Sequence, residues 1–228
     1  MKITWIGQGG RLFDIDGVKV LVDPYLSNSV QKIEPKNKRR VPVKRKFLKV
    51  KPNLIILTHS HLDHTDPETL KYYLKDGSVT VLASYNAWKT VRETFKGSNN
   101  YVMFNAGTSW TENGVTFKAV YAEHSDFYAI GVVFTVNGKT YYVAGDTLYN
   151  EKVFASITDK IDYCFIPVNG RGNNMNFTEG KEFVKRLGAT AIPIHCGLFD
   201  NINLNDFDYK NKIVFNFYEE KEFKYENY

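Results

Sequence analysis

Short apolar runs separated by turn residues open the chain and predict β-strands. Residues 2–7, 11–15 and 19–24 each have the length of a strand, and an Asp-Gly pair lies between the last two, where a hairpin turn is expected. After a polar stretch, residues 53–59 form an apolar run that ends in a histidine. Such a run is typical of a strand that is buried on both faces of a sheet.

The next part of the chain alternates between helical and strand patterns. Asp66 followed by proline matches a helix N-cap, and the apolar spacing after it predicts a helix over 67–75. A strand over 78–84 and a second helix over 86–96, which Gly97 would end, follow. This alternation indicates an α/β fold.

The middle of the chain has the pattern of a β-meander. Runs over 115–122, 130–136 and 140–145 include an Asn-Gly turn and predict antiparallel strands. The run over 162–168 predicts a further strand.

The last part of the chain predicts one more helix between strands. Thr178 is the expected cap of this helix and Gly188 its expected end, and a strand over 189–195 follows. The tail over 212–225 predicts a final strand or strand pair. Without an internal repeat or a Gly/Ser-rich linker, residues 1–228 are expected to form one α/β domain with more than one sheet.

Composition is that of a globular protein. Hydrophobic residues make up 43% and charged residues 24% of the 228 residues, which excludes disordered, collagen-like and membrane-spanning chains. The N-terminus lacks the apolar run and cleavage site of a signal peptide, so a cytoplasmic protein without membrane association is expected. Cys164 and Cys196 lie in apolar stretches and are expected to be buried, reduced thiols.

Positive charge is concentrated in one segment. The net charge is +5, yet residues 32–51 hold ten Lys or Arg against the single acid Glu34, so the remainder is mildly acidic. A preference for anions should reside in this segment, where Lys38, Arg39 and Arg40 form a candidate anion patch. The alternative is a solvated face, as charge runs commonly are.

The residues with the clearest chemistry are five histidines and nearby aspartates. His59 and His61 follow an apolar strand and are two positions apart, so in an extended segment their side chains can reach one point. A turn then brings Asp63 and His64 to a neighbouring point, as in two-metal hydrolytic sites. Such a cluster is costly to pack unless a divalent cation binds it. Three other candidate ligands also follow predicted strands: His124, Asp146 and His195.

The segment His-Ser-His-Leu-Asp-His at 59–64 resembles the His-x-His-x-Asp-His motif of the metallo-β-lactamase superfamily. The later His124, the Gly-Asp-Thr segment at 145–147 and His195 follow in the order of that superfamily. The resemblance implies an α/β fold, a four-layer αββα sandwich, with the site at one edge between two sheets. It also implies the ligand set: His59, His61 and His124 for a first metal, Asp63, His64 and His195 for a second, and Asp146 as the bridge.

Two further stretches are similar to the compact branch of the superfamily that includes the ascorbate-6-phosphate lactonase. They are residues 5–26 and residues 123–147, in which a His-Ser pair precedes a hairpin that leads to Gly-Asp-Thr. Gln8 stands where many relatives have histidine. The similarity implies a phosphorylated sugar lactone as a candidate substrate.

This ligand set predicts metal-dependent hydrolysis. Two bridged divalent cations lower the pKa of a bound water toward about 7 and polarise a carbonyl or phosphoryl oxygen. Asp63 or Asp146 can relay a proton to the leaving group. Zinc or manganese is the expected metal, and iron also suits these ligands.

The candidate substrate contacts lie in loops. Arg171, with Asn169 beside it, follows a strand and can meet a phosphate or carboxylate, unless it is only a solvated loop arginine. Tyr149, just after Gly-Asp-Thr, is a candidate for the mouth of the site. Arg39 and Arg40 of the basic segment are further candidates.

Three functions fit the sequence. The first is hydrolysis of a small anionic metabolite, for example a phosphorylated sugar lactone. The second is a nucleic-acid phosphodiesterase that uses residues 32–51 to neutralise phosphates, although Phe47 is the only aromatic residue there. The third is a metal-binding sensor without turnover, which the full ligand set disfavours. Aromatic residues of the tail would suit a homo-oligomer interface.

Overall fold

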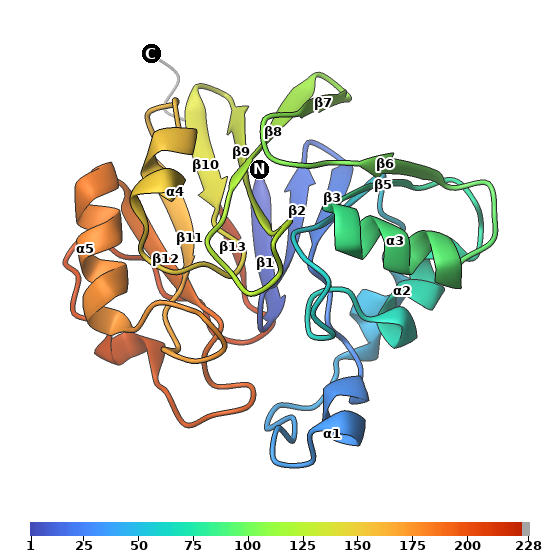
Figure 1. The fold of residues 1–228 in the computed structure, drawn as a ribbon, viewed down its shortest axis with the longest axis horizontal. Coiled ribbons are helices and arrows are strands. Elements are labelled where there is room, and N and C mark those ends of the chain that lie inside the picture. The colour runs from blue at the N-terminus through green and yellow to red at the C-terminus, as the bar shows by residue number, and fades with distance from the viewer. Residues whose placement is uncertain (225–228) are drawn as a thin grey trace.

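Two β-sheets lie face to face in the computed structural model, which describes residues 1–224 (Figure 1). The first sheet has the order β13 (Glu220–Glu222), β1 (Lys2–Gly7), β2 (Gly10–Ile15), β3 (Val18–Val22), β4 (Leu54–Leu57), β5 (Thr80–Ala83) and β6 (Asn100–Met103). The second has the order β12 (Thr190–Ile194), β11 (Tyr163–Pro167), β10 (Lys139–Val143), β9 (Ile130–Val136), β8 (Val115–Tyr121) and β7 (Ser109–Glu112).

Helices cover the outer face of each sheet (Figure 1). Those on the first sheet are α2 (Pro67–Leu74) and α3 (Tyr85–Thr94), and those on the second are α4 (Glu151–Ser156) and α5 (Phe177–Leu187). The short α1 (Ser29–Ile33) and the 3₁₀ turns η1 (Arg45–Lys49) and η2 (Leu204–Asp206) lie in connections. Within residues 1–224, each helix is too short or too polar to cross a bilayer. The four layers confirm the predicted αββα sandwich.

Strand β4 shows why the sequence produces this layering. Leu54 and Ile56 belong to the core between the two sheets, whereas Ile55 and Leu57 belong to the core between the first sheet and its helices. Successive side chains of a strand point to opposite faces, and here both faces are covered, so every position is apolar. Across the inter-sheet core, Phe13 packs edge-on against rings of the facing sheet, with ring centroids 5.2 and 5.5 Å apart.

The carboxyl ends of several strands meet at one edge of the sandwich. Strands β3, β4 and β5 run parallel to one another, and so do β10, β11 and β12. Strand β8 is antiparallel to β9, which is antiparallel to β10, so β8 and β10 end on the same side. Ligand sites in such sheets form beyond the carboxyl ends of strands. The residues that follow β4, β8, β10 and β12 are therefore brought together.

Two predicted helix boundaries were wrong. Helix α5 is capped by Asn176, whose side chain accepts a hydrogen bond from the Glu179 backbone N–H while the Glu179 carboxylate accepts one from the Asn176 backbone N–H. This reciprocal capping box makes the helix begin at Phe177, so Thr178 lies inside it. Helix α3 ends at Thr94, before Gly97.

The sequence pattern did not reveal the short edge elements. Strands β6 and β7 and helices α1 and α4 were not predicted, since they are short and only partly buried. In the tail, a single strand, β13, pairs with β1, and the end of the predicted tail at Tyr225 lies outside the described residues. Cys164 and Cys196 are free and buried, as predicted.

Candidate metal centre

Five histidines and two aspartates from four strand ends meet in one cluster. They form three overlapping groups, and within each group the donor atoms lie within 4.8 Å of one another. The first group is His59, His61 and His124. The other two share His64 and are together called the second group: His59, His64 and Asp146, and Asp63, His64 and His195. The structure therefore brings together all seven residues that the sequence indicated as ligands.

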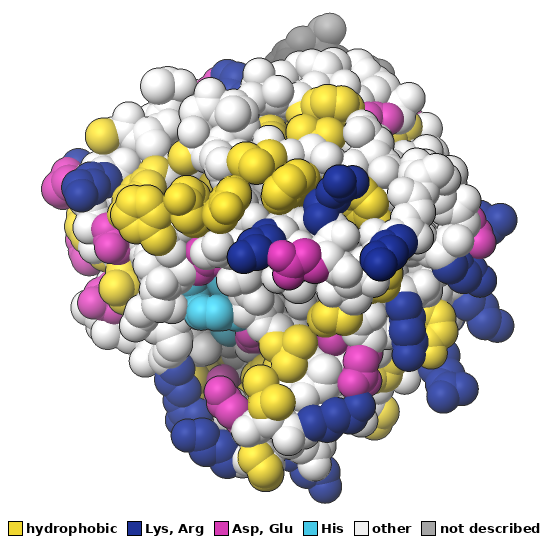
Figure 2. Space-filling model, turned by 45° about the vertical axis from the view of Figure 1, so that its right-hand side comes forward, with side chains coloured by type: hydrophobic (Ala, Val, Ile, Leu, Met, Phe, Trp, Pro, Cys, Tyr) yellow, Lys and Arg dark blue, Asp and Glu magenta, His cyan; other side chains and the backbone are white. Residues whose placement is uncertain are grey.

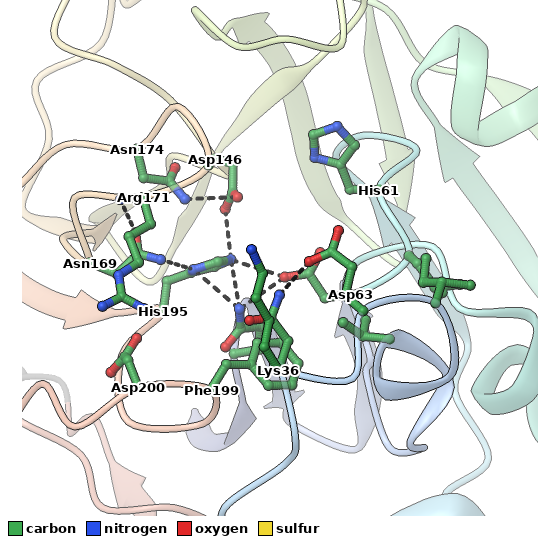
Figure 3. A pocket seen from close by; sticks show the side chains of 17 residues that line it. Lys36, His61, Asp63, Asp146, Asn169, Arg171, Asn174, His195, Phe199 and Asp200 are labelled. Carbon is green, nitrogen blue, oxygen red and sulfur yellow. Dashed lines mark hydrogen bonds and ion pairs between the residues drawn. The ribbon is translucent and has the colours of Figure 1, made fainter.

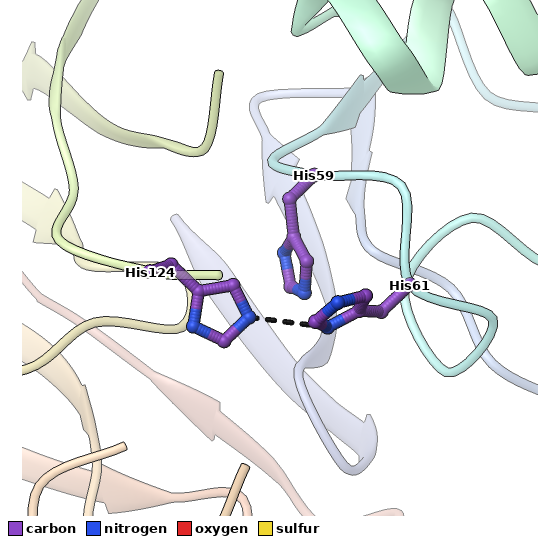
Figure 4. A group of neighbouring side chains, drawn as sticks. All are labelled: His59, His61 and His124. Atoms are coloured by element: carbon purple, nitrogen blue, oxygen red, sulfur yellow. Dashed lines mark hydrogen bonds between the residues drawn. The ribbon is translucent and has the colours of Figure 1, made fainter. Parts of the chain in front are cut away.

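The first group consists of three imidazoles that face one another (Figure 4). His124 Nε2 lies 3.1 Å from His61 Nδ1. His124 Nδ1 is 3.2 Å from the carbonyl oxygen of Asn173, to which its N–H can donate. With the proton on Nδ1, the lone pair of Nε2 is directed at the other two imidazoles. His59 Nε2 is fully buried and makes no hydrogen bond. A buried nitrogen without a partner is costly unless a cation satisfies it.

The second group places carboxylates against imidazoles at the base of a cavity. His64 Nε2 and His195 Nε2 are 3.0 Å apart, and Asp146 Oδ1 lies 3.2 Å from each of them. Asp146 Oδ1 is buried and accepts no hydrogen bond, while its Oδ2 accepts one from the Asn174 amide at 2.8 Å. Asp63 Oδ2 lies 3.5 Å from His195 Nε2. The unpartnered oxygen therefore points toward the ring nitrogens of the cluster.

The charges within the cluster favour a bound cation. Burial and the neighbouring His64 hold the pKa of His59 well below its ordinary value, so this ring is neutral and ready to bind a metal. Burial alone would lower the pKa of His64, but Asp146 and Asp23 hold it well above its ordinary value. Burial alone would raise the pKa of Asp146, but His195 and His64 hold it well below its ordinary value. Buried carboxylates and imidazoles thus require positive charge between them, which suits a divalent metal ion such as Zn²⁺, Mn²⁺ or Fe²⁺.

Asp23, at the end of β3, fixes the orientation of His64. Its Oδ2 lies 2.8 Å from His64 Nδ1 and accepts a hydrogen bond from the Thr58 hydroxyl at 2.6 Å, while Oδ1 accepts one from the Thr58 backbone N–H at 2.8 Å. The carboxylate holds the proton on Nδ1 and leaves Nε2 free as a ligand. Asp23 was not among the predicted site residues, although its place near the end of a predicted strand was an available signal.

Asp126 joins the two loops that carry the first group. Its carboxylate accepts hydrogen bonds from the backbone N–H and hydroxyl of Ser60, at 2.9 and 2.7 Å, and from the Asn86 amide at 2.7 Å. Burial alone would raise the pKa of Asp126, but the hydrogen bonds from Ser60 and the Tyr128 backbone lower it. Since Ser60 lies between His59 and His61, and Asp126 is two residues after His124, this contact fixes the three imidazoles relative to one another. Asp126 also was not among the predicted site residues.

Gln8 lies directly against the second group. Its side-chain amide donates to Asp63 Oδ2 at 2.9 Å and lies 3.3 Å from both ring nitrogens of His195. The residue is buried and its φ is +51°, a conformation that non-glycine residues rarely adopt. A strained backbone thus holds this amide at the centre of the site.

Gly9 leaves room for the His64 ring. A Cβ atom at Gly9 would lie 2.5 Å from His64 Cε1, and Asp23 prevents the ring from moving away. We expect Gly9→Ala to weaken metal binding about 10- to 100-fold, the usual cost of displacing a ligand's orientation. Titration with a fluorescent metal chelator measures this. Gly97→Ala, where the nearest neighbour would be 3.9 Å away, is the matched control. Equal metal affinity of Gly9→Ala and the wild type would contradict the expected role of Gly9.

A cavity of about 610 Å³ opens onto the second group (Figure 3). The space-filling view shows histidine, in cyan, in a recess of the surface (Figure 2). Asp63, Asp146 and His195 form part of its lining. Two of the predicted substrate contacts, Asn169 and Arg171, also line it, and the Asn169 amide lies 3.1 Å from His195 Nδ1.

The other predicted substrate contacts are not among the described residues that line this cavity. Arg39 is buried and its guanidinium donates to the carbonyl oxygens of Tyr25 and Ser27, at 2.6 and 3.1 Å, so it is a structural residue. Arg40 is exposed and does not belong to the described lining. The Tyr149 hydroxyl accepts a hydrogen bond from Arg186 at 3.2 Å. The basic segment instead contributes Lys36, which was not among the predicted substrate contacts.

Comparison with known proteins agrees with this geometry. Residues 18–196 match the family described as "Beta-lactamase superfamily domain". A protein of Thermoplasma acidophilum named "UPF0173 metal-dependent hydrolase" is 31% identical over 221 residues, which cover 92% of this chain and 89% of that protein. The structure is similar to that of Igni18, a metallo hydrolase of Ignicoccus hospitalis, with a TM-score of 0.75, 21% identity and coverage of 98% and 99% of the two chains. It is also similar to that of YhfI, a metallo-beta-lactamase fold protein of Bacillus subtilis, with a TM-score of 0.73, 18% identity and coverage of 96% and 98%. The chain therefore belongs to the family described as "Beta-lactamase superfamily domain" and is a metal-dependent hydrolase with the metallo-β-lactamase fold.

Proposed function

We propose that the protein uses two divalent metal ions to hydrolyse a small anionic metabolite. The observation that carries this proposal is the cluster of seven donor residues at the base of a cavity, with His59 Nε2 and Asp146 Oδ1 buried and without hydrogen bonds. The residues that would hold the first ion are His59, His61 and His124, those for the second are Asp63, His64 and His195, and Asp146 would serve both.

The chain's own residues prepare this site for hydrolysis, which adds OH to the acyl or phosphoryl centre and H to the leaving oxygen. When bound, the metal ions supply a water-derived nucleophile near neutral pH and a Lewis acid for the reacting oxygen. Asp23 and the Asn173 carbonyl hold the Nδ1 protons of His64 and His124, which keeps the Nε2 atoms free. The Gln8 amide keeps Asp63 at the floor of the cavity, where this carboxylate can receive and pass on a proton.

The size of the cavity supports a small substrate. A volume of about 610 Å³ is within the range of metabolite sites. Its lining includes the polar side chains of Asn169 and Arg171, which can bind hydroxyl and anionic groups. A phosphorylated sugar lactone, the substrate class that the sequence resemblance implies, has both kinds of group.

The position of residues 45–51, the last part of the basic segment, argues against a nucleic-acid phosphodiesterase. Arg45, Lys49 and Lys51 line a different groove of about 360 Å³, together with Tyr72 and Lys75. This groove shares no described lining residue with the metal-site cavity. Phosphates bound along it would not be directed to the metal ligands.

Metal analysis and a substrate panel test the proposal. We expect about two equivalents of zinc or manganese per chain, and turnover of phosphorylated lactones by the loaded protein. Cleavage of RNA that falls steeply with salt would instead favour the phosphodiesterase. Metal binding without turnover of lactones, esters or phosphodiesters would favour a sensor. Asp146→Asn, which alters a candidate metal ligand, is the negative control.

A further inference from the structure

Two cationic side chains reach the metal-site cavity without a partner. Lys36 and Arg171 approach it from different loops (Figure 3). Within residues 1–224, neither the ammonium group of Lys36 nor the guanidinium group of Arg171 makes a hydrogen bond or ion pair. Two arginines elsewhere show the contrast: Arg186 pairs with Glu151, and Arg39 donates to backbone carbonyls. Lys36 and Arg171 are therefore available to a ligand.

The acidic side chains of the same cavity do not neutralise these cations. Asp200 accepts hydrogen bonds from the backbone N–H groups of Gly197 and Ile202, at 2.7 and 2.9 Å. Asp63 and Asp146 belong to the metal ligands, and the exposed Glu34 accepts a hydrogen bond from the Asn37 amide at 2.5 Å. A counter-anion for Lys36 and Arg171 would therefore come with the substrate.

The loop of Arg171 is held against the metal ligands. Its neighbour Asn174 donates to Asp146 and accepts from the Thr147 backbone N–H, and the Asn173 carbonyl lies against His124. Gly170 has a φ of +64° and donates to the Met175 carbonyl, which closes the loop. The backbone that carries the Arg171 guanidinium is therefore fixed by contacts with Asp146, Thr147 and His124.

Arg39, close to Lys36 in the sequence, anchors the loop that carries Lys36. The Arg39 guanidinium binds the carbonyls of Tyr25 and Ser27, and the Arg40 backbone N–H donates to the Leu198 carbonyl at 2.9 Å. These contacts connect the basic segment to the rim of the cavity. Lys36 consequently lies at the cavity, although Lys38 of the same segment does not belong to the described lining.

The same rim presents apolar side chains to the cavity. Ile33 of α1 is 67% exposed, and Leu62 and Phe199 also line the cavity. An exposed isoleucine at a binding cavity suits a ligand with an apolar part, because contact between the two removes apolar surface of both from water.

We propose that Lys36 and Arg171 bind a phosphate or carboxylate group of the substrate, and that Ile33 and Phe199 contact an apolar segment that joins this group to the reacting ester or lactone. This inference rests on the proposed hydrolytic function and specifies its substrate class. Arginine binds such an anion through two parallel N–H donors and lysine as a point charge.

Two matched esters test this substrate class. The metal-loaded protein is assayed with 4-nitrophenyl hemisuccinate, which carries a terminal carboxylate, and with the uncharged 4-nitrophenyl butyrate. We expect Lys36→Ala and Arg171→Ala each to raise the KM for the hemisuccinate about tenfold, with little change in kcat, because each removes one charge-assisted contact. The KM for the butyrate should not change. Lys38→Ala and Arg40→Ala, which remove the same charges outside the described lining, should leave both esters unaffected. Ile33→Ala should raise the KM for both.

A binding measurement separates failure of this inference from failure of the proposed function. If the wild type hydrolyses neither ester, calorimetric titration with phenyl phosphate decides. Binding that Lys36→Ala and Arg171→Ala each weaken about tenfold would support the anion site even without turnover. Binding or KM values that are the same in these variants and in the Lys38→Ala control would overturn the inference, whether or not hydrolysis occurs.

Discussion

Asp146→Asn is expected to lower kcat about 10³-fold, equivalent to about 4 kcal/mol of transition-state stabilisation. Asp146 Oδ1 is the buried oxygen without a hydrogen bond, and it lies 3.2 Å from ring nitrogens of both His64 and His195. Asparagine keeps the shape but removes the negative charge, and it can place an N–H where the cluster needs an acceptor. Steady-state hydrolysis of the substrate that the panel identifies measures the effect.

The control for this variant is the same substitution at a surface aspartate that forms an ion pair away from the site. Asp159 pairs with Lys118 at the surface, so Asp159→Asn should retain wild-type kcat. Metal content is measured in parallel, and we expect Asp146→Asn to bind fewer than two equivalents. Retention of more than a tenth of the wild-type kcat by Asp146→Asn would show that Asp146 is not needed between the metal ions.

Removal of metal should lower the melting temperature by about 8 to 16 °C. A ligand that binds only the folded state at about 1,000 times its Kd stabilises it by about 4 kcal/mol. For a protein of this size, 1 kcal/mol corresponds to about 2 to 4 °C. The binding residues come from four separate strand ends and two sheets, so the unfolded chain cannot present them together. Thermal melts followed by circular dichroism, with and without EDTA, measure the shift.

A variant with a damaged site distinguishes this effect from general effects of the chelator. In Gly9→Ala, where the new Cβ would displace His64, EDTA should shift the melting temperature much less than in the wild type. If metal analysis shows bound ions and EDTA still leaves the wild-type melting temperature unchanged, the metal does not stabilise the folded state.

The sequence indicated the residues of the metal centre but not the groups that orient them. His59, His61 and Asp63 are close in sequence, so their type and spacing were enough to suggest a shared target. Asp23 reaches His64 across 41 positions, and Asp126 reaches Ser60 across 66. The role of such a carboxylate depends on its partner, and only the folded chain brings the partner near.

In the basic segment as well, the sequence did not indicate which residues line the cavity. In the sequence, Lys36, Lys38 and Arg39 are three cations of one charge run. In the structure, Arg39 turns inward to backbone carbonyls, Lys36 lines the cavity and Lys38 lies exposed beyond the lining. An irregular loop has no fixed period of side-chain direction, so no spacing rule could assign these three positions.

For the fold, the sequence by itself determined the elements that are most deeply buried. The apolar runs of β4 and β9 and the helical spacing of α2 and α5 result from burial, because buried positions require apolar residues. The tertiary structure decided the short edge strands β6 and β7, the cap of α5 and the convergence of four strand ends on one metal centre. These features depend on contacts between segments distant in sequence, whose free energy is gained only once the two sheets have packed together.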